Sequence, residues 1–317
     1  MTSARLLFSV LIPVLLEAVA PPRRPNVVMV IFDDLRPVLG AYGDPLASTP
    51  YLDDFARGSH VFTRTYSQQS LCAPSRNSLL TGRRPDTLHL YDFYSYWRTF
   101  TGNFTTLPQY FKEHGYYTYS CGKGDHGWSL GEHAEWAKYS NFEVALRVPL
   151  IIRSPQFPLT QTKYHHGITE LLDVFPTLVD LVGLPKLPTC QDSQELTCGE
   201  GKSLYYQLLG LGRADEHVAL SQYPRPGMLP TKHPNSDKPK LRNIKIMGYS
   251  LRTDIYRYTL WVRFHAQNFS KDWNDVYGEE LYDHRLDSGE ELNLVPLPEF
   301  DDVRQRLRRR LMEVVGS

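Results

Sequence analysis

The hydrophobic positions of the chain fall into short continuous runs and into segments with helical spacing. The run NVVMVIFDDL at 26–35 predicts a buried parallel strand whose carboxyl end carries Asp33 and Asp34. Two more runs predict strands, YYTYSC at 116–121 and VPLIIRSP at 148–155. Helical spacing, with Gly and Pro near the expected ends, predicts helices within 49–62, 77–85, 105–115 and 168–185, the first of them followed by a short strand at the end of 49–62. This alternation is typical of an α/β fold with a mostly parallel central sheet flanked by helices.

The pattern changes beyond a segment at about 187–240 that is rich in Pro, Gly and polar residues. Apolar and polar residues then alternate over 244–264, with many aromatic and β-branched side chains, which predicts antiparallel strands. The run VRQRLRRRLMEVV at 303–315 predicts a basic amphipathic helix. We therefore expect an N-terminal domain over 21–212 and a smaller C-terminal α+β subdomain with an antiparallel sheet over 213–317.

Residues 1–20 have the composition of a secretory signal peptide. Arg5 precedes an apolar run, and Ala18 and Ala20 form an A-x-A cleavage site. Because neither this run nor a later one reaches the roughly twenty residues that span a bilayer, we expect a soluble mature protein without a membrane span. Asn103 and Asn268 begin N-x-S/T sequons, the acceptor pattern for glycosylation in the secretory pathway.

The net charge of the chain offers no overall attraction for a polyanion. Lys plus Arg and Asp plus Glu each number 35. This balance argues against a nucleic-acid-binding protein. An anionic substrate must therefore be recognised locally.

Four cysteines in an oxidising compartment favour disulfide formation. Cys190 and Cys198 lie eight residues apart in a polar loop, and we predict a bond between them. Cys72 and Cys121 remain. A bond between those two is the alternative to a chemical role for Cys72.

Two acidic motifs and one cysteine motif are candidates for chemistry. Asp33-Asp34 and Asp125-His126 offer ligands for a divalent cation, although each pair taken alone is more often a turn or a helix cap. The run CAPSR places Cys72 at the start of a predicted helix, with a guanidinium one turn further on. Since the amino end of a helix favours an anion, this position suits anionic chemistry.

The run CAPSR followed by LLTGRRP resembles the signature of type I sulfatases, a family in the alkaline-phosphatase superfamily. The motifs IFDDLRP at 31–37, DHGWSLGEHAEWAKYSNFEV at 125–144 and IKIMGYSLRT at 244–253 extend the resemblance through nearly the whole chain. They are most similar to members that remove the 2-O-sulfate of iduronate from heparan and dermatan sulfate. The resemblance implies the sulfatase fold, with the catalytic domain at 21–212, these glycosaminoglycans as substrates, and a route through the secretory pathway to the lysosome.

The resemblance also implies the cofactors. In this family a formylglycine-generating enzyme oxidises the motif cysteine to formylglycine, so Cys72 would be the precursor of the nucleophile and would be spared from pairing. The hydrated aldehyde attacks the sulfur of the ester and later expels sulfate. The family's calcium ligands correspond to Asp33, Asp34, Asp125, His126 and the converted Cys72.

Four basic residues match groups that handle the substrate. Arg76 corresponds to the family's arginine beside the nucleophile. Lys123 and Lys138 correspond to lysines that bind the sulfate group. Lys238, in SDKP, is a candidate for binding the substrate carboxylate.

The chain departs from the family between Lys123 and Asp125, where a long stretch is absent. Relatives carry two histidines there that help to protonate the leaving oxygen and to bind sulfate. The imidazoles that remain nearby, His133, His165 and His166, are poorly placed to replace them. We therefore expect severely impaired turnover.

Two alternatives to the sulfatase hypothesis stay open. A phosphatase or phosphodiesterase of the superfamily is disfavoured, because those relatives have serine or threonine where this chain has Cys72. An inactive isoform or pseudoenzyme of the secretory pathway is favoured by the missing histidines.

Overall fold

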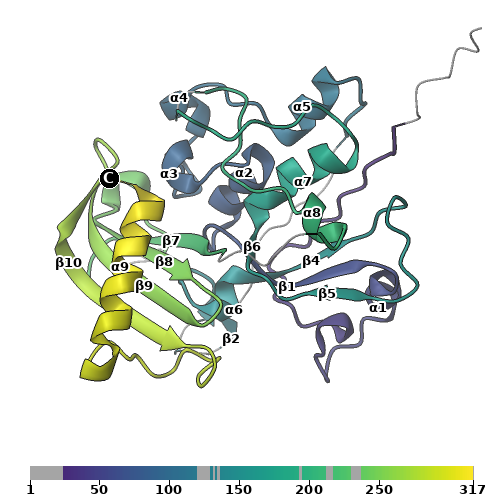
Figure 1. Cartoon of the computed structure of the whole chain (residues 1–317). Helices are drawn as coiled ribbons and strands as arrows, with labels where there is room; N and C mark the ends of the chain where they lie inside the picture. The colour runs from purple at the N-terminus through teal and green to yellow at the C-terminus, as the bar shows by residue number, and fades with distance from the viewer. Residues whose placement is uncertain are drawn as a thin grey trace, which may run out of the picture.

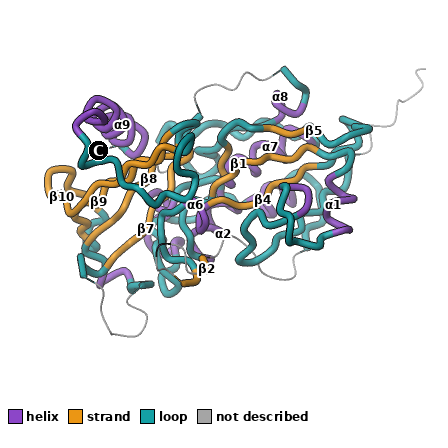
Figure 2. Tube along the Cα trace, turned by 90° about the horizontal axis from the view of Figure 1, so that it is seen from below, coloured by secondary structure: helices purple, strands orange, loops and turns teal. Residues whose placement is uncertain are grey.

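The computed structural model describes residues 24–119, 129–130, 133, 136–192, 195–211, 217–229 and 237–316. The predicted signal peptide lies outside them. Two sheets occupy opposite sides of the molecule, a small one around β1 and an antiparallel one covered by α9 (Figure 1). The same separation is visible from below (Figure 2). The α/β class with a separate antiparallel sheet is therefore confirmed.

The small sheet has β1 (His60–Tyr66) at its centre. This strand pairs antiparallel with β4 (Arg147–Ile152), and parallel with β5 (Lys163–His165) and β6 (Thr169–Glu170). The sheet is thus mixed. The strand predicted at 148–155 is confirmed as β4, and the one predicted at the end of 49–62 as the start of β1.

Helices connect and cover this sheet. They are α1 (Pro50–Ala56), α2 (Cys72–Thr81), α3 (Pro85–Leu88), α4 (Trp97–Thr101), α5 (Leu107–Glu113), α6 (Glu143–Leu146), α7 (Val174–Leu181) and α8 (Tyr205–Leu208). Short 3₁₀ turns lie at η1 (Gly40–Tyr42), η3 (Leu171–Asp173), η4 (Leu241–Asn243) and η5 (Pro298–Phe300), and β2 (Ser129–Leu130) pairs with β3 (Trp136–Ala137). Helix α2 ends because Gly82 adopts a left-handed conformation with φ of 65°. Each of the four helices predicted in this half of the chain is present, with α7 inside 168–185.

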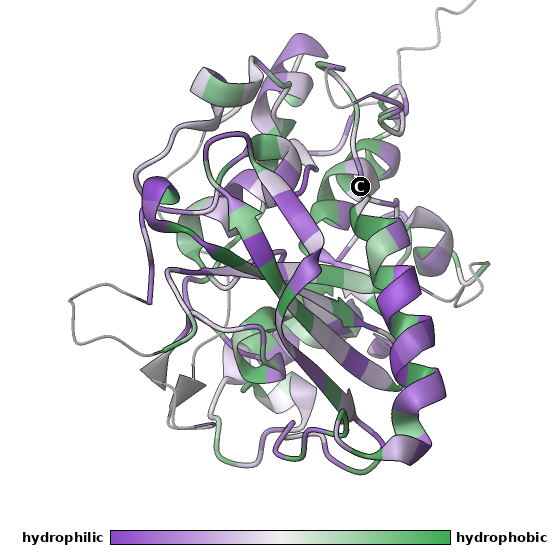
Figure 3. Cartoon of the chain, turned by 90° about the vertical axis from the view of Figure 1, so that its left-hand side faces the viewer, coloured by the Kyte–Doolittle hydropathy of each residue, from purple (hydrophilic) through white to green (hydrophobic). Residues whose placement is uncertain are grey.

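The antiparallel sheet has the strand order β10-β9-β8-β7. Its strands are β7 (Ala219–Arg225), β8 (Ile246–Arg252), β9 (Tyr256–His265) and β10 (Ser270–Asp283), and α9 spans Asp301–Val315. Hydrophilic and hydrophobic residues alternate along α9 (Figure 3), and Leu307 and Leu311 are buried against the sheet. The predicted strands at 244–264 and the amphipathic helix are confirmed. The domain boundary near 212 stays a prediction.

The two sheets are joined at the segment between β1 and α2. The Gln222 amide of β7 donates to the Gln68 carbonyl (2.8 Å), and the Ser221 hydroxyl donates to the Ser67 carbonyl (2.6 Å). This segment leads directly into Cys72. The antiparallel sheet therefore helps to position the start of α2.

Two predicted strands are wrong. Residues 26–32 and 116–119 form no strand, and Val28 and Val30 are 84% and 71% exposed. A strand needs a neighbour to satisfy its backbone groups, and in the described part of the chain no strand pairs with either segment. They do lie near one another, since the Tyr116 hydroxyl donates to the Pro25 carbonyl (3.2 Å). The end of the second prediction, at 120–121, lies outside the described residues.

Candidate active site

Cys72 is the first residue of α2 and is buried. Leu71 precedes it in an extended conformation, so the chain turns into the helix at the cysteine itself. The side chain is a thiol, and the alternative bond to Cys121 involves a residue outside the described ones. At this position the helix dipole favours a negatively charged group.

Asp33 and Asp34 reach this helix start although the residues before them form no strand. The Cys72 sulfur lies 3.8 Å from Asp33 Oδ1, and Arg76 Nη2 lies 3.5 Å from the same oxygen. Ligand atoms of Asp33, Asp34 and Cys72 all lie within 4.8 Å of one another. Two carboxylates this close repel each other, and a cation between them would relieve the repulsion.

Lys138 supplies one positive charge to this cluster. Its ammonium donates to Asp34 Oδ1 (2.8 Å) and lies 3.1 Å from the Cys72 sulfur. Burial lowers the pKa of Lys138, but the hydrogen bonds to Asp34 and Cys72 outweigh burial and raise it overall. The side chain therefore stays charged. The expectation that Lys138 lies at the site, rather than on the solvated surface, fits this geometry.

Lys238 lies close to the same cluster through Tyr139. Its ammonium lies 3.5 Å from the Tyr139 hydroxyl and 5.3 Å from the ring centroid, and the Lys138 ammonium lies 6.0 Å from that centroid. The tyrosine thus separates two cations. Tyr139 was not among the predicted site residues. Its position next to Lys138 was the available signal, and its left-handed φ of 70° appears only in the structure.

The residues present fit a hard divalent cation in part. Asp33 and Asp34 offer carboxylate oxygens on one side of Cys72, and calcium prefers oxygen ligands. The thiol of Cys72 is a soft ligand, and its conversion to formylglycine would replace sulfur by oxygen. The remaining predicted site residues, Lys123, Asp125 and His126, lie outside the described residues, as does Cys121.

The imidazoles considered as replacements take part in packing. His133 stacks on Phe142 with the ring centroids 3.8 Å apart, and His165 stacks on Phe62 at 4.6 Å. His166 contacts the Thr63 hydroxyl. These contacts hold the rings within or beside the small sheet and its loops.

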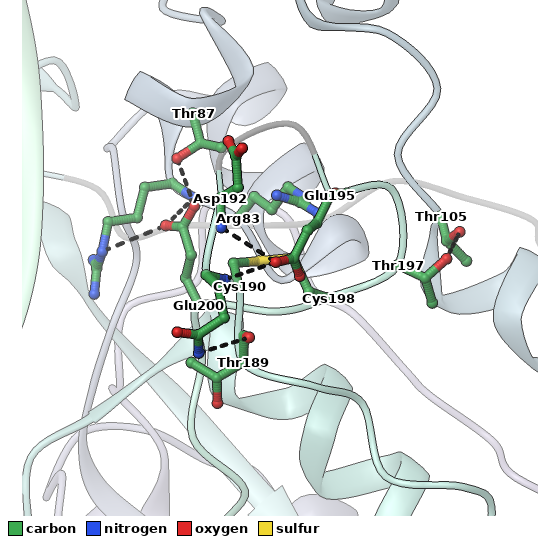
Figure 4. Close-up of a disulfide and its surroundings, with 12 residues drawn as sticks. Arg83, Thr87, Thr105, Thr189, Cys190, Asp192, Glu195, Thr197, Cys198 and Glu200 are labelled. Atoms are coloured by element: carbon green, nitrogen blue, oxygen red, sulfur yellow. Dashed lines mark hydrogen bonds and ion pairs between the residues drawn. A yellow bond between two sulfur atoms is a disulfide. The ribbon is translucent and has the colours of Figure 1, made fainter.

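The predicted disulfide between Cys190 and Cys198 is confirmed (Figure 4). Arg83 Nη2 lies 3.0 Å from the Cys198 sulfur, and its guanidinium lies 3.8 Å from the centroid of the Phe104 ring. Thr105 and Thr197 are also hydrogen-bonded (2.8 Å). The disulfide loop therefore packs against the segments on both sides of α3 and α4.

Both sequon asparagines are exposed. Asn103 accepts a hydrogen bond from Arg98 (2.9 Å), and Asn268 accepts one from the Ser270 hydroxyl (2.9 Å). Their exposure is compatible with glycosylation, which stays a prediction. Within the described residues, every helix is too short or too polar to cross a bilayer.

Comparisons with known proteins agree with this site. The sequence profile of the sulfatase family, described as Sulfatase, matches residues 25–129, which include Asp33, Asp34, Cys72 and Arg76. Iduronate 2-sulfatase of Mus musculus is 29% identical, over 81% of this chain and 88% of the relative, and the Homo sapiens protein gives the same values. These alignments run over 489 positions against 317 residues here, so at least 172 positions of the relative have no counterpart.

Structural comparison supports the same assignment. A solved 2-O GAG sulfatase superposes with a TM-score of 0.69 at 16% identity, covering 92% of each chain, which shows a shared fold. The sequence profile, the related sequences and the superposed structure are thus all those of sulfatases. Residues 25–129 match the sulfatase family, and the chain resembles iduronate 2-sulfatases over 81% of its length.

Proposed function

We propose that the chain is a sulfuric ester hydrolase of the iduronate 2-sulfatase type, acting on the 2-O-sulfate of iduronate in heparan and dermatan sulfate. The observation that carries the proposal is the environment of Cys72. The cysteine starts α2 within the CAPSR run, beside Asp33 and under the ammonium of Lys138. The alignment with iduronate 2-sulfatases supports the substrate.

Formylglycine made from Cys72 by the generating enzyme would supply the nucleophile, a hydrated aldehyde that attacks sulfur and then releases sulfate. The chain's own residues prepare the site for an anion. Lys138 and Arg76 place two positive charges beside Cys72, where they offset the charge of a sulfate ester. Lys123 is proposed to bind the same group.

Asp33 and Asp34, with Asp125 and His126, are proposed to hold one calcium ion. When bound, calcium would act as a Lewis acid towards the sulfate oxygens. The two described carboxylates have their ligand atoms within reach of one ion. Adding calcium should raise the thermal midpoint of the folded chain by mass action, and an unchanged midpoint would contradict the assignment.

Lys238 and Tyr139 are proposed to bind the sugar. The Lys238 ammonium lies beside the Tyr139 hydroxyl, so the pair presents a charge and a hydrogen-bonding group. A uronate offers a carboxylate that would accept from both. Under this proposal, Lys138 recognises the sulfate group and Lys238 recognises the carboxylate.

The proposal is tested on protein secreted by cells that contain the generating enzyme. Peptide mass spectrometry should show formylglycine at position 72, and a 2-O-sulfated iduronate disaccharide should lose sulfate at a measurable rate. The Cys72→Ala variant is the control and should release none. Cys72 found only as a thiol would remove the main support for the proposal.

A second candidate function is a catalytically inactive isoform of the secretory pathway. The observation in its favour is that residues 26–32, which lead into Asp33, lie outside any sheet. A segment without a neighbouring strand positions the carboxylates of Asp33 and Asp34 poorly. Formylglycine at position 72 without any sulfate release would favour this candidate.

A further inference from the structure

A cavity of about 670 Å³ lies outside the proposed site. It lies between α4, the turn η4 and the turn that joins β9 to β10. We call it the side groove. Its lining consists of Asp92, Tyr94, Ser95, Tyr96, Thr99, Phe100, Lys240, Leu241, Arg242, Ala266 and Gln267.

Aromatic rings of the side groove face solvent. Tyr94 and Tyr96 are 57% and 59% exposed, and Phe100 is exposed as well. Exposed rings in a hollow mark a ligand-binding surface rather than a part of the core. A ring with an apolar face and a polar tip suits a sugar, which has apolar C–H faces and a rim of hydroxyls.

The charge of the side groove favours an anion. The Lys240 ammonium lies 4.9 Å from the centroid of the Tyr94 ring, and Arg242 is exposed two residues further on. The one carboxylate in the lining, Asp92, accepts from the backbone amides of Tyr94 (3.0 Å), Ser95 (2.7 Å) and Leu241 (2.7 Å). These amides compensate the charge of Asp92, which thereby holds the segment at Tyr94 and Ser95 next to Leu241. The charge of the groove surface is therefore set by Lys240 and Arg242 and is positive.

The side groove continues from the proposed site along the backbone. Lys240 follows Lys238 by two residues, so their Cα atoms are at most about 7 Å apart. Lys238 contacts the Tyr139 hydroxyl, and Tyr139 follows Lys138 in the sequence. The Lys138 ammonium in turn contacts the Cys72 sulfur. A chain whose end sugar lies at Cys72 can therefore pass Lys238 and enter the side groove.

We propose that the side groove binds the sugars that follow the sulfated end residue of an anionic glycosaminoglycan chain. The rings of Tyr94 and Tyr96 stack on sugar faces, and Lys240 and Arg242 pair with sulfate or carboxylate groups. The identity of the end sugar rests on the proposed function. The binding of the following sugars does not depend on turnover.

The test measures binding in a Cys72→Ala background by calorimetry. The probes are a heparan sulfate hexasaccharide and a disaccharide, each with a 2-O-sulfated uronate at its non-reducing end. The double variant Lys240→Ala/Arg242→Ala should bind the hexasaccharide about tenfold more weakly, because each exposed ion pair contributes up to roughly fivefold. Binding of the disaccharide should change less than twofold.

A matched control uses a similar pair outside the groove. The Lys186 ammonium lies 5.8 Å from the centroid of the Tyr206 ring, and that tyrosine is 54% exposed. The control variant Lys186→Ala/Arg57→Ala also removes one lysine and one arginine charge. It should leave the affinities for the hexasaccharide and the disaccharide within twofold. Tyr94→Ala should weaken hexasaccharide binding about threefold, whereas Tyr206→Ala should not.

Two results would overturn the inference. Equal hexasaccharide affinity in the groove and control variants would remove the groove from the binding surface. Binding that appears only after enzymatic removal of N-glycans would assign the groove to the chain's own glycan, because Asn268 follows the lining residue Gln267.

Failure of the proposed function is a separate outcome. Groove-dependent binding together with an absence of sulfate release by the Cys72 chain would leave the inference standing and refute the activity. Sulfate release from the hexasaccharide with a KM that is unchanged in Lys240→Ala/Arg242→Ala would refute the inference and leave the activity standing.

Discussion

At the scale of single residues, the sequence predicts which groups carry chemistry, and the structure adds their distances. Cys72 and Lys138 are 66 positions apart, and their side chains lie 3.1 Å apart. The motif around Cys72 predicts a nucleophile precursor, because the proposed conversion depends on adjacent residues. Tyr139 was not predicted, because its place beside Lys138 in the sequence does not show whether the tyrosine faces the site or the surface.

Removing the Lys138 ammonium should destabilise the helix start. In Lys138→Met, Asp34 loses a charged donor in a partly buried place, and we expect about 1–2 kcal/mol lower unfolding free energy. Chemical denaturation with a calcium chelator present would measure this, with Lys186→Met as the exposed control. An unchanged free energy would show that Lys138 is not engaged as the structure has it.

At the scale of elements, helices were predicted well and strands unevenly. Signals for α2 and α5 are local, such as Gly82 after the first and the Thr106 hydroxyl that accepts from the Gln109 amide in the second. Strands β8 and β9 pair across a short turn, so their partners are also close in sequence. The run at 26–35 has a strand's composition, but whether a strand forms depends on a distant partner.

Glu143 of α6 ties the small sheet to the antiparallel one and gives the chain a pH dependence. It accepts from Arg257 (2.6 Å) and Arg252 (3.2 Å). Burial raises the pKa of Glu143, but the two guanidinium groups outweigh burial and lower it to about 2. The pKa of Glu143 is thus lower in the folded chain than in the unfolded chain. The ion pairs of Glu143 therefore stabilise the folded chain fully at pH values above the ordinary pKa of glutamate, and this stabilisation is lost as pH falls towards 2.

We therefore expect Glu143→Gln to cost about 3 kcal/mol of unfolding free energy at pH 6.5, since it leaves buried arginines with less compensation. The difference from the native chain should shrink between about pH 4.5 and pH 2. Denaturation curves across this range would measure it, with the exposed Glu299→Gln as the control. A difference independent of pH would contradict the ion-pair explanation.

The exposed apolar segment at 26–32 is an aggregation hazard. Val28 and Val30 are the most exposed of its large hydrophobic residues, and a strand-forming sequence without a neighbour can pair with other chains. Val28→Lys/Val30→Lys should raise the secreted monomer yield severalfold and leave the thermal midpoint unchanged. A fall in the midpoint of more than a few degrees would show that these valines pack in the folded chain.

At the scale of the whole molecule, the chain is shorter than the relatives with which it aligns. The alignment with the full-length relatives leaves at least 172 of their positions without a counterpart. The antiparallel sheet, which lies after this gap, forms as expected, and its β7 still bonds to the segment before Cys72. The segments 26–32 and 116–119 both precede the gap predicted between Lys123 and Asp125, and neither belongs to a sheet among the described residues.

The same gap leads to the last prediction, that turnover of a sulfated iduronate substrate is severely impaired even with Cys72 converted and calcium bound. The absent histidines remove proton transfer, which is typically worth 10²- to 10⁴-fold. Asp33 and Asp34 follow a segment that no described strand supports, and a misplacement of about 1 Å can cost a further 10²-fold. Assays of the purified chain beside the Mus musculus relative would measure the difference. Comparable rates would mean that the nucleophile, the metal ligands and Lys138 suffice without the missing segment.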